Sequence, residues 1–232
     1  GFPLITTKKV YFNSVIRELL WYLSGETHIR NLRKHTKIWD AWTSEEKNWE
    51  VGKMYGYQWV NWDKYESSPT NGAIHHSHIN QIQNVIELIK TNPNSRRMVV
   101  SAWNPAVLDK IALPSCHAFF MFNVTNGKLN CHLTQRSGDI ALGIPFNLAC
   151  YATLTEMIAM ETGLEVGEFS HYINDAHIYE NHIDGLKEQL TREPLPLPSL
   201  KIDDKPFWDL KFEDFSLENY QHHPVIKFPV AV

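Results

Sequence analysis

Four side chains that could carry chemistry lie close together in the sequence: Cys116, Arg136, Asp139 and Asn147. A cysteine thiolate is a nucleophile, an arginine is a permanent cation, and an asparagine amide offers both a hydrogen-bond donor and an acceptor. We therefore expect a site that attacks a small anionic ring compound and recognises its polar edge. Because a free thiol is mostly protonated at neutral pH, such a site needs a cation beside the cysteine.

A β-hairpin would bring these residues together. An apolar run from His117 to Val124 leads into Thr125-Asn126-Gly127-Lys128, which is a strong signal for a two-residue turn. An extended pattern then resumes from Leu129 to Gln135.

The pairing of this hairpin decides whether the arginine can serve the thiol. Uninterrupted pairing about the turn places Cys116 opposite Ser137 and His117 opposite Arg136, so the Cys116 and Arg136 side chains point to opposite faces. If Arg136 assists the thiol, a bulge or a strand end must interrupt the pairing, and Gly138 suits such an interruption.

The remaining pattern indicates a sheet that carries helices. Helical spacing and extended runs each recur in three segments. The helical segments are Lys9–Leu23 (strongest from Val15), Ile79–Lys90 and Phe146–Glu161, and the extended runs are Met98–Trp103, Ala118–Val124 and Leu129–Gln135. The chain has 232 residues, of which 43% are hydrophobic, and no long hydrophilic linker divides it. We expect one α+β domain over residues 1–232.

Composition excludes several functional classes. The chain carries 22 basic and 26 acidic residues, so a broad nucleic-acid surface is not expected, because duplex binding neutralises many phosphates. Three cysteines leave one unpaired in any disulfide scheme, which favours a reducing cytosol. No apolar run approaches the roughly 20 residues of a membrane span, and no signal peptide is visible. We expect a soluble, cytoplasmic protein.

Two groups of residues in the first third of the chain allow more than one interpretation. Glu18 lies within a mostly apolar helical stretch, where it is either an exposed residue of the polar face or a buried proton carrier with a raised pKa. Five tryptophans follow at positions 39, 42, 49, 59 and 62. Rings at this density usually fill a core, but they also form walls for flat heterocycles.

Three histidines, His75, His76 and His78, follow a Ser/Pro/Asn-rich loop at Ser67–Asn71. Histidines this close could bind zinc, but no cysteine or carboxylate lies nearby at ligand spacing. A solvated loop is the favoured interpretation, and no metal site is predicted.

Polar groups farther along the chain also allow structural roles. Arg96 and Arg97 are surface charges or a bidentate clamp for phosphate. Asn147 caps its helix or reads a ring edge. Asp175, His177 and Tyr179 alternate along an extended segment and would share one face, where they form a structural trio or bind a sugar hydroxyl. The apolar C-terminus is either a flap over a ligand or a docked strand.

Read together, these segments resemble thymidylate synthase over essentially the whole chain. Among the matching strings are Phe2–Lys8, Glu18–Trp21, Ile38–Asp40, Tyr55-Gly56, Ser95–Arg97, Ser101–Asn104, Cys116-His117, Gln135–Ser137, Asp139, Leu142-Gly143, Pro145–Asn147, Asp175–Tyr179 and Pro229–Val232. The resemblance implies a mixed β-sheet covered by helices and a homodimer formed through the sheet. It also implies conversion of dUMP to dTMP with 5,10-methylenetetrahydrofolate as cosubstrate, without a metal, a membrane or an obligate nucleic acid.

The resemblance implies a role for each matching residue. Cys116 would attack carbon six of the pyrimidine, Glu18 would organise the proton-carrying water with Tyr55 and Asp175 nearby, and Arg136 would favour the thiolate. The remaining substrate contacts would come from Gln135, Arg136, Ser137, Asn147, His177 and Tyr179, with Arg96 and Arg97 reaching the neighbouring subunit's phosphate. The folate side would be lined by Trp39, Trp42, Leu113, Asp139, Leu142, Gly143, Phe146 and the terminal Val230–Val232, which includes Ala231.

Departures from the family pattern leave two alternatives. Five positions differ from the residues usual in the family: Ser115, Asn174, Tyr11, Thr134 and Val60. The first alternative is an enzyme that hydroxymethylates dUMP, because such a relative would share most of the same site. Asn147 favours uracil over cytosine. The chain begins at Gly1, so we expect that an N-terminal segment of the family is missing, and a non-catalytic nucleotide-binding protein is the second alternative.

Overall fold

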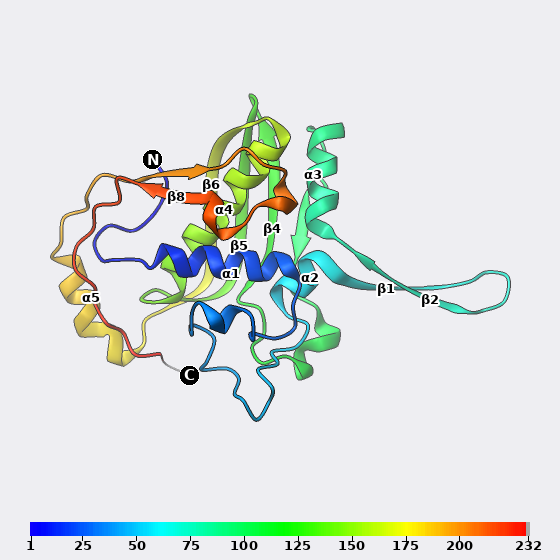
Figure 1. The fold of residues 1–232 in the computed structure, drawn as a ribbon, viewed down its shortest axis with the longest axis horizontal. Coiled ribbons are helices and arrows are strands. Elements are labelled where there is room, and N and C mark those ends of the chain that lie inside the picture. Colours follow the sequence, from blue (N-terminus) through cyan, green and yellow to red (C-terminus); the bar gives the residue numbers. More distant parts are fainter. Residues whose placement is uncertain (231–232) are drawn as a thin grey trace.

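The computed structural model of the protein describes residues 1–230, and Figure 1 shows its fold. Its centre is a four-stranded sheet in the order β3-β4-β5-β6. These strands are β3 (Val99–Ser101), β4 (His117–Thr125), β5 (Lys128–Asp139) and β6 (Glu165–His177). The first three strands are antiparallel, whereas β5 and β6 are parallel. Since a parallel pair needs a crossover, a helix joins β5 to β6. The mixed sheet and the α+β class predicted from the sequence are confirmed.

Helices pack around this sheet. The α-helices are α1 (Phe12–Ser24), α2 (Tyr55–Asn61), α3 (Gln81–Thr91), α4 (Gly143–Thr162) and α5 (Ile183–Leu190). Short 3₁₀ helices are η1 (Leu32–Lys34), η2 (Pro105–Lys110), η3 (Glu180–His182), η4 (Phe207–Asp209) and η5 (Phe212–Asp214). Two small antiparallel sheets complete the fold: β1 (Trp62–Ser67) with β2 (Ile74–Ile79), and β7 (Ser199–Ile202) with β8 (Phe215–Glu218).

The predicted helices are confirmed with shifted ends. The crossover helix α4 begins at Gly143, three residues before the predicted start at Phe146. It is the central helix of the core, because its middle residues, from Ala149 to Ala159, are almost all buried. A helix that is apolar on all sides must be covered on all sides. It ends where Gly163 adopts the left-handed conformation.

The predicted hairpin is confirmed, and its turn contains Asn126 and Gly127, both at positive φ. The strands pair as an uninterrupted hairpin would, from Thr125 opposite Lys128 up to Phe119 opposite Thr134. The register then shifts by one residue between Phe119 and His117, so that His117 pairs with Gln135. The interruption is therefore a bulge at residue 118 of β4, and not at Gly138, where β5 continues in pairing with β6.

Aromatic rings fill much of the core between α1, α2 and the sheet. Trp59 is fully buried and contacts Tyr22, Phe120 and Tyr151. Helices α1 and α2 approach closely at Gly56, where a Cβ atom would clash with the Tyr22 backbone. The core interpretation of the tryptophans therefore holds for Trp59, while Trp39 has a further contact described below.

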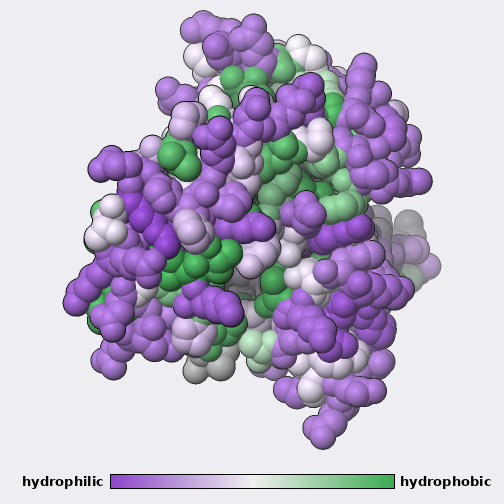
Figure 2. All heavy atoms as spheres, turned by 60° about the vertical axis from the view of Figure 1, so that its left-hand side comes forward, coloured by the Kyte–Doolittle hydropathy of each residue, from purple (hydrophilic) through white to green (hydrophobic). Residues whose placement is uncertain are grey.

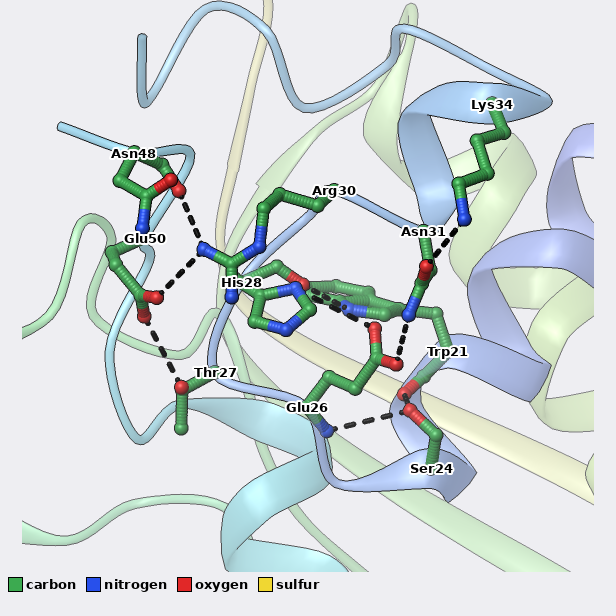
Figure 3. Close-up of polar contacts among 10 residues, drawn as sticks. All are labelled: Trp21, Ser24, Glu26, Thr27, His28, Arg30, Asn31, Lys34, Asn48 and Glu50. Carbon is green, nitrogen blue, oxygen red and sulfur yellow. Dashed lines mark hydrogen bonds and ion pairs between the residues drawn. The ribbon is translucent and has the colours of Figure 1, made fainter. Parts of the chain in front are cut away.

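The long segment between α1 and α2 is held by the polar network of Figure 3. Arg30 donates from Nη1 to the Asn48 carbonyl oxygen at 2.7 Å and to Glu50 Oε1 at 3.0 Å. The second carboxylate oxygen of Glu50 accepts from Thr27 Oγ1 at 3.2 Å. These contacts close the base of the loop from residue 28 to 50, whose Trp39 packs against Trp21 of α1.

The segments near both chain ends lie against each other on one side of the molecule (Figure 1). The Thr6 carbonyl accepts from the His223 backbone N–H at 2.9 Å, and Arg192 bridges the carbonyls of Thr7 and Pro224. Figure 2, in which this side comes forward, shows hydrophobic residues near the middle of the face with hydrophilic residues around them. None of the helices within residues 1–230 combines the length and the hydrophobicity of a membrane span.

Candidate active site

The bulge in β4 brings Cys116 and Arg136 to the same side of the hairpin. The backbone N–H of Arg136 donates to the Cys116 carbonyl at 2.8 Å. The guanidinium then lies over the thiol, with Nη2 at 3.7 Å from Sγ. The sequence predicted this contact between Cys116 and Arg136 only if the strand pairing is interrupted. Both the interruption and the contact are present.

Arg136 is held in this position by the chain that precedes the cysteine. Its Nε donates to the Ser115 carbonyl at 3.0 Å, and its Nη2 donates to the Pro114 carbonyl at 2.7 Å. Two bonds to backbone carbonyls fix the plane of the guanidinium, which a single ammonium could not achieve. The same bonds fix the loop that presents the thiol.

Tyr55, the first residue of α2, supports the cysteine from the other side. Its hydroxyl oxygen accepts from the Cys116 backbone N–H at 2.7 Å, and its ring stacks on His117 with 4.0 Å between centroids. Burial, followed by the nearby Cys116, raises the pKa of Tyr55 well above its usual value. Burial also lowers the pKa of His117 to about 3, so this ring is neutral, and its Nδ1 lies 2.7 Å from the Tyr151 hydroxyl.

The three thiols differ in accessibility. Cys131 and Cys150 are buried, whereas Cys116 is partly exposed. Burial raises the pKa of Cys131 to about 12 and raises the pKa of Cys150 well above its usual value. Because only a thiolate is nucleophilic, these two cysteines are inert. Cys116 is the thiol that can react.

Glu18 is buried, so the exposed interpretation of this residue is wrong. Burial raises its pKa to about 7, although hydrogen bonds from Trp39 and Tyr22 act in the opposite direction. Trp39 Nε1 donates to Glu18 Oε1 at 2.7 Å, and the Trp39 ring packs against Trp42 at 5.2 Å between centroids. A carboxyl group with a pKa near neutrality can both accept and release a proton. Trp39 reaches Glu18 from the loop between α1 and α2, a contact that sequence spacing alone does not reveal.

Asn147 belongs to an amide network and does not cap α4. The helix begins four residues earlier, at Gly143, so the capping interpretation is wrong. Gln135 Nε2 donates to Asn147 Oδ1 at 3.0 Å and to the Ser137 carbonyl at 2.8 Å. Gln135 Oε1 lies 2.8 Å from His171 Nε2. With its oxygen engaged by Gln135, Asn147 has its amide NH₂ group available as a donor.

The parallel pairing of β5 and β6 places the predicted sugar-binding residues beside the predicted phosphate-binding ones. Ser137 pairs with Asp175, and Asp139 pairs with His177. The rings of His177 and Tyr179 meet at 5.2 Å between centroids. The predicted trio is brought together: His177 contacts Tyr179 ring to ring, and its Nδ1 lies 4.0 Å from Asp175 Oδ2, although β6 ends at His177.

Asp139 lies where β5 ends, next to His182 and Lys8, for which no role was predicted from the sequence. His182 is fully buried, and its Nδ1 is 3.6 Å from Asp139 Oδ1. Lys8 donates to the Ala141 carbonyl, and burial lowers its pKa to about 8, although the charge of Asp139 opposes this shift. The only sequence signal was the place of Lys8 in the Phe2–Lys8 string.

The C-terminal segment contacts His182 and Lys8, the two residues beside Asp139. His182 Nε2 lies 2.7 Å from the Pro229 carbonyl oxygen, and the Phe228 ring packs on His182 and under the Lys8 ammonium. Up to residue 230 the segment is docked without strand pairing, so the docked-strand interpretation is wrong for this part. Ala231 and Val232, which were predicted to lie on the folate side, are outside the described residues.

Three of the other predicted folate-side residues, Leu142, Gly143 and Phe146, lie at the start of α4. Leu142 directly precedes the helix and Gly143 begins it. A Cβ atom at Gly143 would lie at van der Waals distance from Asp139 and Asn147 and would clash with neither. Because glycine has no side chain, the space between Asp139 and Asn147 stays open. Phe146 and Leu113 are partly buried against the core.

Arg96 and Arg97 are not joined to this group within one chain. Both are exposed, in the turn between α3 and β3. Across residues 1–230, neither side chain takes part in a hydrogen bond or ion pair with Cys116, Arg136 or Ser137.

One comparison with known proteins identifies the family. A protein-family model described as Thymidylate synthase matches residues 1–232. The match covers the whole chain, including every residue of the candidate active site.

Proposed function

The chain belongs to the thymidylate synthase family, and we propose that it converts dUMP to dTMP with 5,10-methylenetetrahydrofolate as the donor of the one-carbon unit and the hydride. The observation that carries this proposal is the contact between Cys116 and Arg136, at 3.7 Å from Sγ to Nη2. An accessible thiol beside a fixed cation is the arrangement that nucleophilic catalysis by cysteine requires.

Covalent catalysis would begin at the pyrimidine ring. The Cys116 sulfur forms a bond to carbon six, and the electron pair of the double bond moves to carbon five, which becomes a nucleophile. Carbon five then bonds to the methylene carbon of the cosubstrate and loses its proton. Loss of that proton expels tetrahydrofolate from the methylene carbon and leaves an exocyclic methylene on carbon five. The same tetrahydrofolate then transfers a hydride to this methylene, which becomes the methyl group, and the double bond between carbons five and six re-forms as the Cys116 thiolate leaves. The products are dTMP and dihydrofolate.

Arg136 has two roles in this proposal. Its bonds to Pro114 and Ser115 use Nε and Nη2, so Nη1, which has no hydrogen-bond partner among residues 1–230, would reach the nucleotide phosphate together with the Ser137 hydroxyl. At the same time the cation stabilises negative charge on sulfur, which makes Cys116 a better nucleophile. One side chain thus couples phosphate binding to thiol activation.

Asn147 would read the uracil edge. Uracil offers an acceptor at its carbonyl oxygen, to which the Asn147 NH₂ group can donate, and a donor at N3, which the second lone pair of the Asn147 oxygen can accept. Gln135 holds this amide by donating to its oxygen, and burial lowers the pKa of His171, so the ring that contacts Gln135 is neutral. His177 and Tyr179 would bind the deoxyribose hydroxyl.

Glu18 would accept and release the protons that are transferred during the reaction. Its pKa of about 7 lets it hold a proton in one step and release it in another at neutral pH. Tyr55 and Asp175 are proposed to act nearby. On the folate side, Asp139, Trp39, Trp42, Leu142, Gly143 and the docked tail would exclude water, so that hydride rather than water reaches the exocyclic methylene.

A homodimer would complete the site. Val99, Met121 and Tyr172 are exposed hydrophobic residues of the central sheet. Val99 pairs with Met121, Met121 with His132, and Tyr172 with Thr134, so these residues share the face opposite the buried Leu133. An uncovered apolar sheet face favours association. A second copy on this face would bring its Arg96 and Arg97 to the phosphate.

Product analysis tests the proposed reaction. We expect incubation with dUMP and methylenetetrahydrofolate to yield dTMP by mass spectrometry, with the absorbance rise of dihydrofolate. Hydroxymethyl-dUMP together with tetrahydrofolate would instead identify a hydroxymethylase. Binding of dUMP without release of tritium from its carbon five would identify a non-catalytic nucleotide-binding protein.

A further inference from the structure

A second group of convergent side chains lies on the β1–β2 hairpin, which extends away from the rest of the fold (Figure 1). The strands are antiparallel, with Asp63 opposite His78 and Tyr65 opposite His76. Because alternate residues share a face, His76, His78 and Asp63 point to the same side, whereas His75 points to the other. The predicted solvated loop is thus a strand, and the facing strand supplies the carboxylate that the linear spacing did not show.

The three side chains meet at their polar atoms. Asp63 Oδ1 lies 2.8 Å from His76 Nε2 and 3.5 Å from His78 Nε2. One ligand atom from each residue falls within 4.8 Å of the others. A tetrahedral zinc ion with bonds of about 2.0–2.2 Å separates its ligands by roughly 3.4 Å. Small side-chain rotations would therefore suffice to place all three atoms around one ion.

The surrounding residues hold these groups in place. Tyr65 stacks on His76 at 4.6 Å between centroids, with only 10° between the ring planes. Tyr57 donates to Asp63 Oδ1 at 3.1 Å, and Lys53 pairs with the other oxygen, Oδ2, at 2.7 Å. Hydrogen-bonded partners of this kind orient metal ligands. Since Lys53 engages Oδ2, Oδ1 remains the oxygen that faces the histidines.

We propose that Asp63, His76 and His78 form a binding site for a divalent transition-metal ion, with zinc as the best fit. Two imidazoles and one carboxylate are typical zinc ligands, and a fourth position would hold water. The ion would join the two strands at the base of the hairpin, next to α2. An isolated two-stranded hairpin is only marginally stable, so a metal link would order it. The nearby Lys53 ammonium limits the affinity, because it competes for the same carboxylate.

Calorimetric titration of the tag-free, chelator-treated protein with zinc chloride tests this proposal. We expect one zinc ion per chain. His76→Gln, His78→Gln and Asp63→Asn should each raise the dissociation constant by at least about tenfold. His75→Gln is the matched control, because this neighbouring histidine is exposed on the opposite face, and it should leave binding unchanged. In wild type, zinc should also slow amide hydrogen exchange in residues 62–79.

Two results would overturn the metal site. One is the absence of stoichiometric zinc binding by the wild-type chain. The other is equal weakening by His75→Gln and His76→Gln, which would indicate adventitious binding by surface histidines. All four substituted side chains are exposed or only partly buried in the hairpin, and far-ultraviolet circular dichroism confirms that each variant is folded. Neither readout depends on the proposed methyltransferase reaction.

Discussion

Arg136 faces Cys116 because a single extra residue in β4 shifts the strand register beside the thiol. Phe119 still pairs with Thr134, but His117 pairs with Gln135, so Cys116 comes level with Arg136. The guanidinium nitrogen Nη2 therefore lies 3.7 Å from Sγ instead of on the opposite face of the sheet. A local irregularity in backbone pairing creates the contact on which the proposed chemistry depends.

Replacement of the nucleophile should abolish turnover. We expect Cys116→Ala to reduce kcat at least roughly a thousandfold, because no other accessible thiol can form the bond to carbon six, while dUMP still binds. Cys150→Ala is the control, since Cys150 is buried; it should lose some stability but keep its activity. Steady-state rates and equilibrium dialysis measure the two effects. Turnover by Cys116→Ala near the wild-type rate would rule out this residue as nucleophile.

Arg136→Lys should slow the reaction about a hundredfold. A lysine ammonium cannot bond both carbonyls of residues 114 and 115 and also face the sulfur. We expect slower alkylation of Cys116 by iodoacetamide as a second, independent readout. Arg30→Lys, in the network of Figure 3, is the matched control and should react normally. Unchanged thiol reactivity in Arg136→Lys would contradict the activating role of the arginine.

The sequence predicted the elements better than their exact contacts. The helices and the hairpin follow from periodicity and from Asn126-Gly127, which are local signals. The bulge at residue 118 has no such signal, because Ala118 is compatible with regular pairing, and Gly138 suggested the wrong place. Burial of Glu18 requires Trp39 from a distant loop, and the Asp63–His78 contact requires the register of a second hairpin. These contacts between distant segments are set by packing.

Asn147→Asp should shift nucleotide preference from dUMP towards dCMP. The substitution removes the amide donor and supplies a second acceptor, which suits the exocyclic amino group of cytosine. We expect the ratio of dissociation constants to change about tenfold to a hundredfold. Asn84→Asp, which makes the same change at an exposed position of α3, should have no effect. Equal selectivity in both variants would refute the recognition role of Asn147.

Glu18→Gln should change the pH dependence of stability. The pKa of Glu18 is raised from 4.5 to about 7, so the folded state binds this proton more tightly than the unfolded chain. The resulting stabilisation is complete below pH 4.5 and is lost as pH rises through about 7. Glutamine mimics the protonated form. The free energy of unfolding of the variant relative to wild type should therefore increase by about 3 kcal/mol between pH 4.5 and pH 8.

Urea denaturation at a series of pH values measures this difference. Glu156, whose pKa burial also raises to about 7, is present in both proteins, so its contribution cancels. Glu87→Gln, at an exposed position of α3, is the control and should parallel wild type at every pH. A constant difference between Glu18→Gln and wild type would show that Glu18 keeps an ordinary pKa.

Covalent trapping tests the central claim that Cys116 bonds to the pyrimidine. With 5-fluoro-dUMP and methylenetetrahydrofolate the reaction should stop at the covalent adduct, because fluorine at carbon five cannot leave as a proton does. Trypsin cleaves after lysine and arginine, which separates the three cysteines into peptides 111–128, 129–136 and 137–187. We predict that mass spectrometry finds the adduct on peptide 111–128, at Cys116. An adduct on another peptide, or nucleotide bound without any covalent product, would contradict the account.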